Sequence, residues 1–306
     1  MKINFFDFDM DESIVAPIIY GENRHYTTNR GVIISSEARQ ELKKFLSGFN
    51  ASVNVEQIPY YRIDIYFNNQ FLWILEINAS FVDGWGTALN LSRASNIVVD
   101  PTRLIFPKRF VTKSKMYLPE LELFMSEMSA LGINDHSICD HSICERDGNS
   151  ADPIYVYGRV GLKNQPHILP YEGLRLDNKL NLGLFSRAWN GNMVKISRHY
   201  INRFEPWEKI PNEVVLKFCD KGSEECQRAG ESVLFNKPTG KAPFLKRCYK
   251  AETLLAQDFV RPSKQNRDNC QLVVLVIGDE PITGYVQYSW NKIINDNSTH
   301  GPLCIN

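Results

Sequence analysis

Residues 61–78 read YRIDIYFNNQFLWILEIN, and this stretch decides the fold expected for the chain. Tyr61–Phe67 alternates between two sets of side chains, with the apolar set on one face, which is typical of a half-buried strand. A second apolar run, Phe71–Ile77, follows after the polar triplet NNQ. Two such runs joined by a short polar connection predict a β-hairpin.

The polar residues of this hairpin are expected on one face. Period-two alternation places Arg62 with Asp64 on the first strand, and Glu76 with Asn78 on the second. When the strands pair, one guanidinium group, two carboxylates and an amide oxygen converge. These oxygens suit Mg²⁺ that is held together with substrate phosphates, and a guanidinium group suits the charge on a transferring phosphoryl group. The alternative reading is an ordinary solvent-exposed sheet face.

A second cluster, VVLKFCDKGS, covers residues 214–223. Lys217 lies inside an apolar strand, where its charge needs a partner. Lys221, Gly222 and Ser223 follow, and small residues with accessible backbone N–H groups predict a phosphate-binding loop. The alternative is an edge-strand lysine whose ammonium group reaches solvent.

The rest of the chain alternates between strand and helix patterns. We expect helices over 36–48, starting at Ser36, from Pro119 to about 131, and over 177–189, capped by Asp177. Further strands are expected over 3–8, 14–20, 214–218, 254–260, 271–277 and 282–289. The sequence therefore predicts an α+β, or mixed α/β, fold.

Length and charge exclude some functions. The 306 residues favour about two domains. Equal numbers of basic and acidic residues, 35 each, argue against nucleic acid or an anionic membrane as the main partner. No apolar run approaches the roughly 20 residues of a membrane helix, and the first residues lack a signal-peptide pattern. Seven cysteines, all after residue 138, are typical of free thiols. We expect a cytoplasmic protein.

Two further features of the sequence are best explained as ordinary surface structure. The pentapeptide DHSIC occurs twice, at 135–139 and 140–144, but its His and Cys spacing matches no zinc module. A polar surface loop within a mobile segment, 134–152, is the favoured interpretation. A basic run contains Arg103, Lys108, Arg109, Lys113 and Lys115. We expect it to be a solvated face, and the alternative is a surface that attracts an anionic substrate or an acidic peptide.

The hairpin resembles the metal-binding end of ATP-grasp ligases, such as D-alanine–D-alanine ligase and glutathione synthetase. Their pattern is Arg-x-Asp, about a dozen residues, then Glu-x-Asn, and here a glycine-rich turn, Asp83–Thr87, follows. The cluster 214–223 resembles the strand lysine and glycine-containing lid of the family. Residues 253–260, TLLAQDFV, resemble its hinge strand, and 271–289 resemble the hairpin after the hinge. The segment 177–197 resembles its first helix, with Lys179 at the first phosphate-contacting position.

The order of these motifs differs from that of ordinary members, in which the lysines and hinge precede the metal hairpin. The resemblance therefore implies a circularly permuted ATP-grasp-like cleft between two subdomains. The metal-binding part of the C-terminal subdomain would be 1–97, and an internal substrate-side domain would be 98–175. The nucleotide-binding subdomain would be 176–265, and 266–306 would return to the C-terminal subdomain. Joining of the old termini is physically reasonable because chain ends usually lie near each other.

The resemblance implies an ATP-dependent carboxylate–amine, or carboxylate–thiol, ligase that forms an acyl phosphate. Its cofactors would be ATP and Mg²⁺, with Asp64, Glu76 and Asn78 as metal ligands. Arg62 and Lys217 would be catalytic. Nucleotide contacts would come from Lys179, Lys217, Lys221, Gly222, Ser223, Gln257, Asp258, Phe259 and Val260. The partners would be a small-molecule or peptide carboxylate and an amine acceptor, with a homodimer expected from the resemblance alone.

Several departures keep other readings open. Gln257 replaces the usual hinge acid, and Gln287 stands where many members carry arginine. The usual ribose-binding acid is absent, with Asp258 or Asp268 as substitutes. A nucleotide-binding or protein-interaction module without turnover is therefore the alternative, and a kinase-like phosphotransferase is a third reading. His300 would line the acceptor site or, in the preferred reading, be a plain loop histidine.

Overall fold

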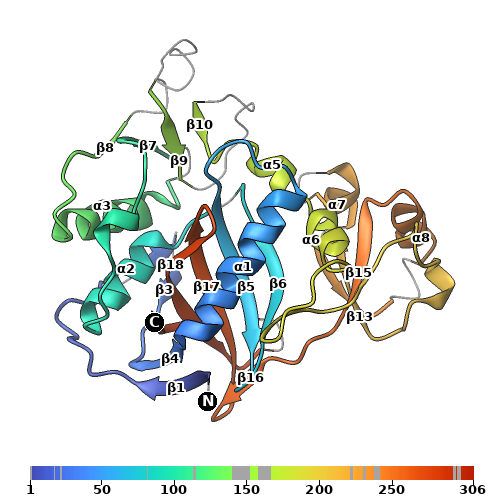
Figure 1. Cartoon of the computed structure of the whole chain (residues 1–306), viewed down its shortest axis with the longest axis horizontal. Coiled ribbons are helices and arrows are strands. Elements are labelled where there is room, and N and C mark those ends of the chain that lie inside the picture. The colour runs from blue at the N-terminus through green and yellow to red at the C-terminus, as the bar shows by residue number, and fades with distance from the viewer. Residues whose placement is uncertain are drawn as a thin grey trace.

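The structure is a computed structural model, and it confirms the α+β class (Figure 1). It describes residues 2–16, 18–20, 23–80, 82–112, 115–139, 152–157, 167–220, 223–229, 232–237, 242–291, 294 and 298–306. Within these residues no helix is both long enough and apolar enough to cross a membrane.

Nine strands of the described chain form the main sheet, which mixes parallel and antiparallel pairs. Eight of them follow the spatial order β1 (Ile3–Asp7), β4 (Arg30–Ile34), β19 (Thr299–Ile305), β18 (Glu280–Ser289), β17 (Asp268–Ile277), β5 (Tyr60–Phe67), β6 (Leu72–Asn78) and β11 (Val194–Ile196), and β16 (Ser263–Gln265) pairs with β17. The sheet thus combines strands from the beginning and the end of the chain.

The predicted β5–β6 hairpin is confirmed. Arg62 lies opposite Asn78 and Asp64 lies opposite Glu76, so the four polar residues share one face, as the alternation predicted. The register then shifts, because Ile65 pairs with Ile74 and Leu75 has no partner position. This β-bulge turns Ile74 toward the buried core, although strict alternation would place it on the face of Glu76. The sequence pattern did not reveal this bulge.

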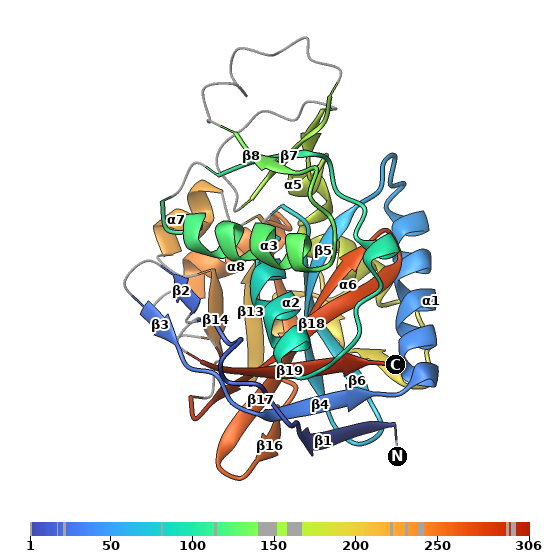
Figure 2. The ribbon, with the colours of Figure 1, turned by 90° about the vertical axis from the view of Figure 1, so that its left-hand side faces the viewer.

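Helices cover both faces of the main sheet (Figure 2). Helix α1 (Ser36–Ser52) packs Phe45 and Phe49 on one face, in the same buried cluster as Ile63 and Val274. Helices α2 (Trp85–Ala94) and α3 (Leu118–Ala130) cover the other face. There, Trp85 and Phe124 share a cluster with Val273, the strand neighbour of Val274. The sheet is therefore buried on both sides where β17 crosses it.

A second, antiparallel sheet lies beside the main one. Its order is β12 (His199–Tyr200), β15 (Leu254–Asp258), β13 (Val214–Phe218) and β14 (Val233–Phe235). Helices α7 (Glu224–Ala229) and α8 (Ala242–Lys250) and the 3₁₀ turn η2 (Trp207–Lys209) share its apolar core. Helix α6 (Lys179–Phe185) contacts strands of both sheets, namely β6, β12 and β15.

The described part of 98–175 packs directly on the main sheet. It contains η1 (Pro101–Arg103), α3, α5 (Gly173–Leu176) and a small parallel sheet of β10 (Ile168–Leu169), β9 (Ile154–Val156), β7 (Arg109–Val111) and β8 (Ser137–Ile138). Phe110 and Tyr155 of this sheet belong to the cluster of Trp85 and Val273. A separate two-stranded sheet is formed by β2 (Ile18–Tyr20) and β3 (Asn23–His25). The four-part domain division stays a prediction.

Several predicted boundaries were wrong. Ser35, not Ser36, caps α1 by accepting a hydrogen bond from the Ala38 N–H, and the helix continues to Ser52. Asn178, not Asp177, caps α6, because its side chain accepts from the Leu180 N–H. Helix α6 also ends at Phe185, before Trp189.

Two segments have a different secondary structure from the one expected. The strand over 14–20 is limited to Ile18–Tyr20. The residues after Gly84, expected as a turn, form α2, and Gly84 itself has the left-handed φ of 87° that starts this helix. A side chain at Gly84 would also collide with the Tyr285 ring, since an added Cβ would lie 2.9 Å from it.

Other predictions fall partly outside the described residues. Ser137 and Ile138 of the first DHSIC copy form the exposed strand β8, whereas the second copy, 140–144, and Lys113 are not described. The described cysteines, Cys139, Cys219, Cys226, Cys248, Cys270 and Cys304, form no disulfide with one another.

Candidate functional site

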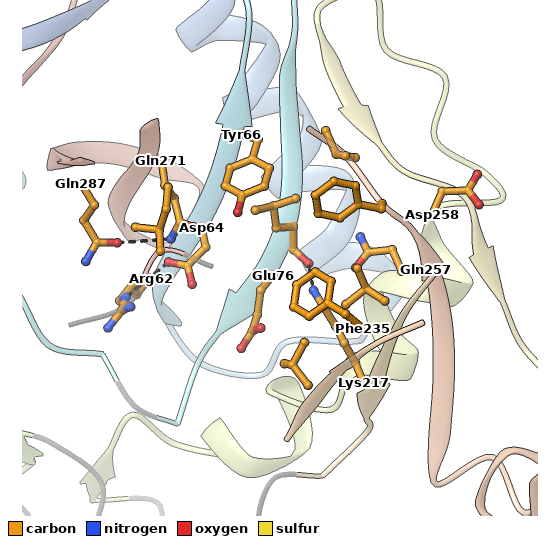
Figure 3. Close-up of a pocket in the computed structure, with 16 residues that line it drawn as sticks. Arg62, Asp64, Tyr66, Glu76, Lys217, Phe235, Gln257, Asp258, Gln271 and Gln287 are labelled. Atoms are coloured by element: carbon orange, nitrogen blue, oxygen red, sulfur yellow. Dashed lines mark hydrogen bonds and ion pairs between the residues drawn. The ribbon is translucent and has the colours of Figure 1, made fainter. Parts of the chain in front are cut away.

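A cavity of about 190 Å³ lies between the main sheet and the second sheet (Figure 3). The main sheet contributes Arg62, Asp64, Tyr66, Leu75, Glu76, Gln271 and Gln287. The second sheet and the residues that follow it contribute Val215, Lys217, Val233, Phe235, Gln257, Asp258, Phe259 and Val260, with Ile294 completing the lining. Most residues chosen from three distant sequence motifs therefore meet at one cavity.

Arg62 is held between two carboxylates. Its Nη1 lies 2.8 Å from Asp83 Oδ1, and its Nε lies 3.4 Å from Asp64 Oδ1. Burial opposes the charge of Arg62, but the carboxylates Asp64 and Asp83 outweigh it and raise its pKa. A permanently charged, oriented guanidinium group therefore faces the cavity from β5.

The predicted metal ligands occupy paired positions of β5 and β6. Asp64 and Glu76 are direct cross-strand neighbours and both line the cavity, and Asn78 is the next residue on the same face as Glu76. Two carboxylates and an amide oxygen fit a Mg²⁺ ion that takes its other ligands from phosphates and water. Within the described residues, no group of three or more His, Cys, Asp and Glu side chains is arranged to hold a metal alone. The donor set thus fits a metal that arrives with a phosphate ligand.

The two lysines have different surroundings. Lys217 lines the cavity, and its ammonium group donates a hydrogen bond to the Leu75 carbonyl oxygen at 2.8 Å. This carbonyl belongs to the bulged residue of β6, so the contact links the two sheets. Lys179 is absent from the cavity lining and instead makes ion pairs with Glu76 and Asp177.

The hinge residues form the other end of the cavity. Gln257 is buried, and its side chain donates to Ser197 Oγ at 2.6 Å. Asp258 accepts a hydrogen bond from the Tyr200 hydroxyl at 2.7 Å. The rings of Phe235 and Phe259 lie edge to face with their centroids 5.8 Å apart. This end is therefore largely apolar, whereas the hairpin end is charged.

The proposed lid is only partly described. Lys221 and Gly222 lie outside the described residues. Ser223 is described, but it is not part of the cavity lining. Its hydroxyl accepts from the Cys226 N–H at 3.2 Å at the start of α7. Ser223 therefore acts here as a helix cap.

Sequence reasoning singled out Gln287 but missed several other lining residues, among them Gln271. Gln271 donates to Gln287 across β17 and β18 at 3.3 Å, and Gln287 Nε2 lies 3.4 Å from His300 Nε2. The available signal was a glutamine inside each of two apolar strands, because a buried amide needs polar partners. Tyr66, Phe235 and Ile294 gave no such signal. His300 lies in β19 and is buried, so its reading as a loop histidine was wrong.

The candidates for ribose binding lie in different places. Asp258 lines the cavity, whereas Asp268 makes an ion pair with Arg30 at 3.0 Å and does not line it. A larger cavity of about 940 Å³ shares Phe235, Asp258 and Phe259 with the first. Asp258 therefore lies where both cavities meet.

Comparison with known proteins gives only a distant likeness. No family model matches the sequence, and no curated protein matches it significantly. One solved structure of similar shape comes from Methylobacillus flagellatus KT and is provisionally described as a gamma-glutamylcysteine synthetase. It matches with a TM-score of 0.44 and 8% sequence identity, over 85% of this chain and 84% of that one. A likeness this distant assigns no function to the cavity.

Proposed function

We propose that this protein is an ATP-dependent carboxylate–amine, or carboxylate–thiol, ligase of the ATP-grasp kind. One observation carries the proposal: a single inter-sheet cavity collects Arg62, Asp64 and Glu76 from one sheet and Lys217 and Gln257 from the other. Charged groups at one end suit phosphates and metal, and the apolar end suits a purine base.

The residues at the two ends of the cavity would bind different parts of the nucleotide. The rings of Phe235 and Phe259 would hold the base, with Gln257 at its edge. Lys217 would leave the Leu75 carbonyl and bind phosphate oxygens. Mg²⁺ held by Asp64, Glu76 and Asn78 would neutralise the charge of the phosphates. Arg62, oriented by Asp64 and Asp83, would stabilise negative charge on the transferring phosphoryl group.

The chemistry then needs no protein nucleophile. The substrate carboxylate attacks the terminal phosphorus of ATP, the bond to the ADP oxygen breaks, and an acyl phosphate forms. The amine attacks the acyl carbon, and phosphate leaves. Catalysis of this kind depends on positioning and electrostatic stabilisation. The carboxylate and amine would bind near the residues that follow β6, on the side of the 98–175 segment.

We further propose that the fold is circularly permuted. Strand β5, from the beginning of the chain, pairs on one side with β17 from the end of it and on the other side with β6. The metal hairpin thereby reaches a cavity whose lysine and hinge lie more than a hundred residues later in sequence. Rearranged connectivity of one unchanged sheet accounts for this order.

Thermal unfolding with and without Mg·ATP tests the nucleotide site. A ligand present at about 100 times its dissociation constant adds roughly 2.7 kcal/mol of stability, which raises the melting temperature by several degrees. We expect a magnesium-dependent rise for the wild type and for Glu122→Ala, an exposed glutamate of α3. The rise should shrink in Asp64→Asn, which keeps the size of the side chain and the Glu76–Lys179 pair. The absence of any rise with millimolar ATP would rule out the cavity as a nucleotide site.

A binding module without turnover is the second candidate. Gln271 and Gln287 hydrogen-bond to each other in the cavity lining, where many ATP-grasp members place an arginine. The site would then have one cation fewer for the terminal phosphate. ATP binding without ADP release, across a broad panel of carboxylates and amines, would favour this candidate over the ligase.

A further inference from the structure

The ammonium group of Lys179 is surrounded by three side-chain oxygens. Its Nζ lies 2.8 Å from Glu76 Oε1, 3.0 Å from Asp177 Oδ1 and 3.4 Å from Asn78 Oδ1. The other oxygen of Asp177 accepts a hydrogen bond from Ser80 Oγ at 2.6 Å. Only 6% of the Lys179 side chain is exposed.

This arrangement satisfies the lysine completely. An ammonium group has three N–H donors and no acceptor, and the three oxygens match that number. Its ion pairs with Glu76 and Asp177 compensate for the burial of its charge, so the group stays a cation in the folded protein.

Two of these three oxygens belong to the proposed metal ligands, Glu76 and Asn78. A Mg²⁺ ion requires oxygens at about 2.0–2.1 Å, closer than the contacts of the lysine Nζ. The ammonium group and a metal ion therefore cannot use the same oxygen pocket at once. Asp64, in contrast, lines the cavity and pairs with Arg62.

We propose that Lys179 is a built-in cation of the site, which takes the place of a second metal ion between Glu76, Asn78 and Asp177. The site then uses one divalent ion, which binds at Asp64 and the cavity side of Glu76 and arrives with the nucleotide. This inference rests on the proposed function and changes one part of it. Lys179 organises the metal ligands, and Lys217 is the lysine that meets phosphate.

Mn²⁺ alone, without nucleotide, tests the inference, because unbound Mn²⁺ is counted directly by electron paramagnetic resonance. We expect weak Mn²⁺ binding, in the millimolar range, by the wild type. Lys179→Met should create a site for one Mn²⁺ that binds at least about tenfold more tightly. The double variant Lys179→Met with Glu76→Gln should lose that site. Lys43→Met is the matched control, because Lys43 makes an ion pair with Glu280 away from the cavity.

Lys179→Met leaves the carboxylates of Glu76 and Asp177 without their cation, which makes folding of the variant depend more strongly on the metal. Mn²⁺-dependent folding of that variant supports the inference as well as direct binding does, and Lys179→Gln, which keeps a hydrogen-bond donor, offers a second folded variant. Wild-type binding of Mn²⁺ as tight as that of Lys179→Met overturns the inference. Failure of Mn²⁺ to bind to, or to fold, either variant also overturns it.

The result is separable from the proposed function. The proposed function fails if Mg·ATP does not raise the melting temperature, whatever Mn²⁺ alone does. If Lys179 were only a phosphate-binding lysine, Lys179→Met would weaken ATP binding and create no metal site. That outcome would agree with the proposed function and would contradict the role of Lys179 as a built-in cation.

Discussion

Individual charged side chains at the cavity are held in place by specific partners. Lys217 lies in a strand whose other residues are apolar, and it is buried with its ammonium group on the Leu75 carbonyl. Arg62 has Asp64 and Asp83. Each partner compensates for the loss of water around a buried charge, which an apolar strand alone would not do.

Replacement of Lys217 by methionine tests the contribution of this side chain to nucleotide binding and to stability. We expect Mg·ATP affinity, measured by isothermal titration calorimetry, to fall at least about tenfold because a charge-assisted contact to phosphate is lost. Urea unfolding should show a loss of about 1–3 kcal/mol, since the Leu75 carbonyl loses its donor. Lys209→Met, at an exposed position of η2, should change neither quantity. Unchanged affinity would assign phosphate binding elsewhere.

His199 makes stability depend on acid pH. Burial, and next the charge of Lys217, lower the pKa of His199 from 6.5 to about 3. The unfolded chain therefore binds a proton below pH 6.5 that the folded chain does not bind until about pH 3. This group should remove about 1.4 kcal/mol of stability per pH unit as the pH falls through that window. Urea unfolding at several pH values should show a shallower loss for His199→Gln. Equal slopes would contradict this.

The decisive feature at the scale of elements is the bulge in β6. Leu75 is the extra residue, and it lets Ile74 and Ile77 face the core while Glu76 and Asn78 face the site. The same residue supplies the carbonyl that Lys217 contacts. One inserted residue therefore sets both the polar face and the link between the sheets.

Deletion of Leu75 should destroy this arrangement, whereas truncation should not. Without the extra residue, Glu76 and Asn78 turn toward the core or Leu72 and Ile74 turn out of it. We expect the deletion to unfold the protein. Leu75→Ala, which keeps the bulge and removes only part of a cavity wall, should cost less than about 2 kcal/mol. Circular dichroism and urea unfolding of both variants test this, and a stable deletion variant would mean that the register can be repaired.

At the scale of the whole molecule, the two chain ends lie near each other. The Asn306 N–H donates to the Ile34 carbonyl at 3.1 Å, and the Ser35 N–H donates to the Lys2 carbonyl at 2.9 Å. Ion pairs from Arg39 and Lys43 of α1 to Glu280 also tie the early helix to the late β17–β18 hairpin. The early and late parts of the chain thus form one packed unit.

A rearranged chain tests whether connectivity alone distinguishes this protein from the proposed family. It would begin at Val98, which is 93% exposed, run to Asn306, continue through a short Gly/Ser linker into Lys2 and end at Ile97. We expect cooperative unfolding and unchanged Mg·ATP affinity. A chain opened instead between Ile65 and Tyr66, inside β5, should not fold. Loss of folding in the first chain would contradict the permuted arrangement.

Much of the secondary structure followed from local patterns. Strand β13 begins and ends where its apolar run does, and the β5–β6 and β17–β18 hairpins follow from alternation and turn residues. Helix α2 was missed because Gly84 and Gly86, at its start, favour a turn. Burial of nearly all of its residues, polar ones included, is decided by the tertiary packing.

The sequence by itself determined the α+β class, the polar face of the hairpin and the residue types at the cavity, because these depend on spacing within one strand or helix. The tertiary structure alone decided that β6 bulges at Leu75, that Gln271 meets Gln287, and that Lys179 joins Glu76 and Asp177. Each of these depends on which groups become buried together, and a buried charge or amide takes whichever partner the packed fold brings within reach.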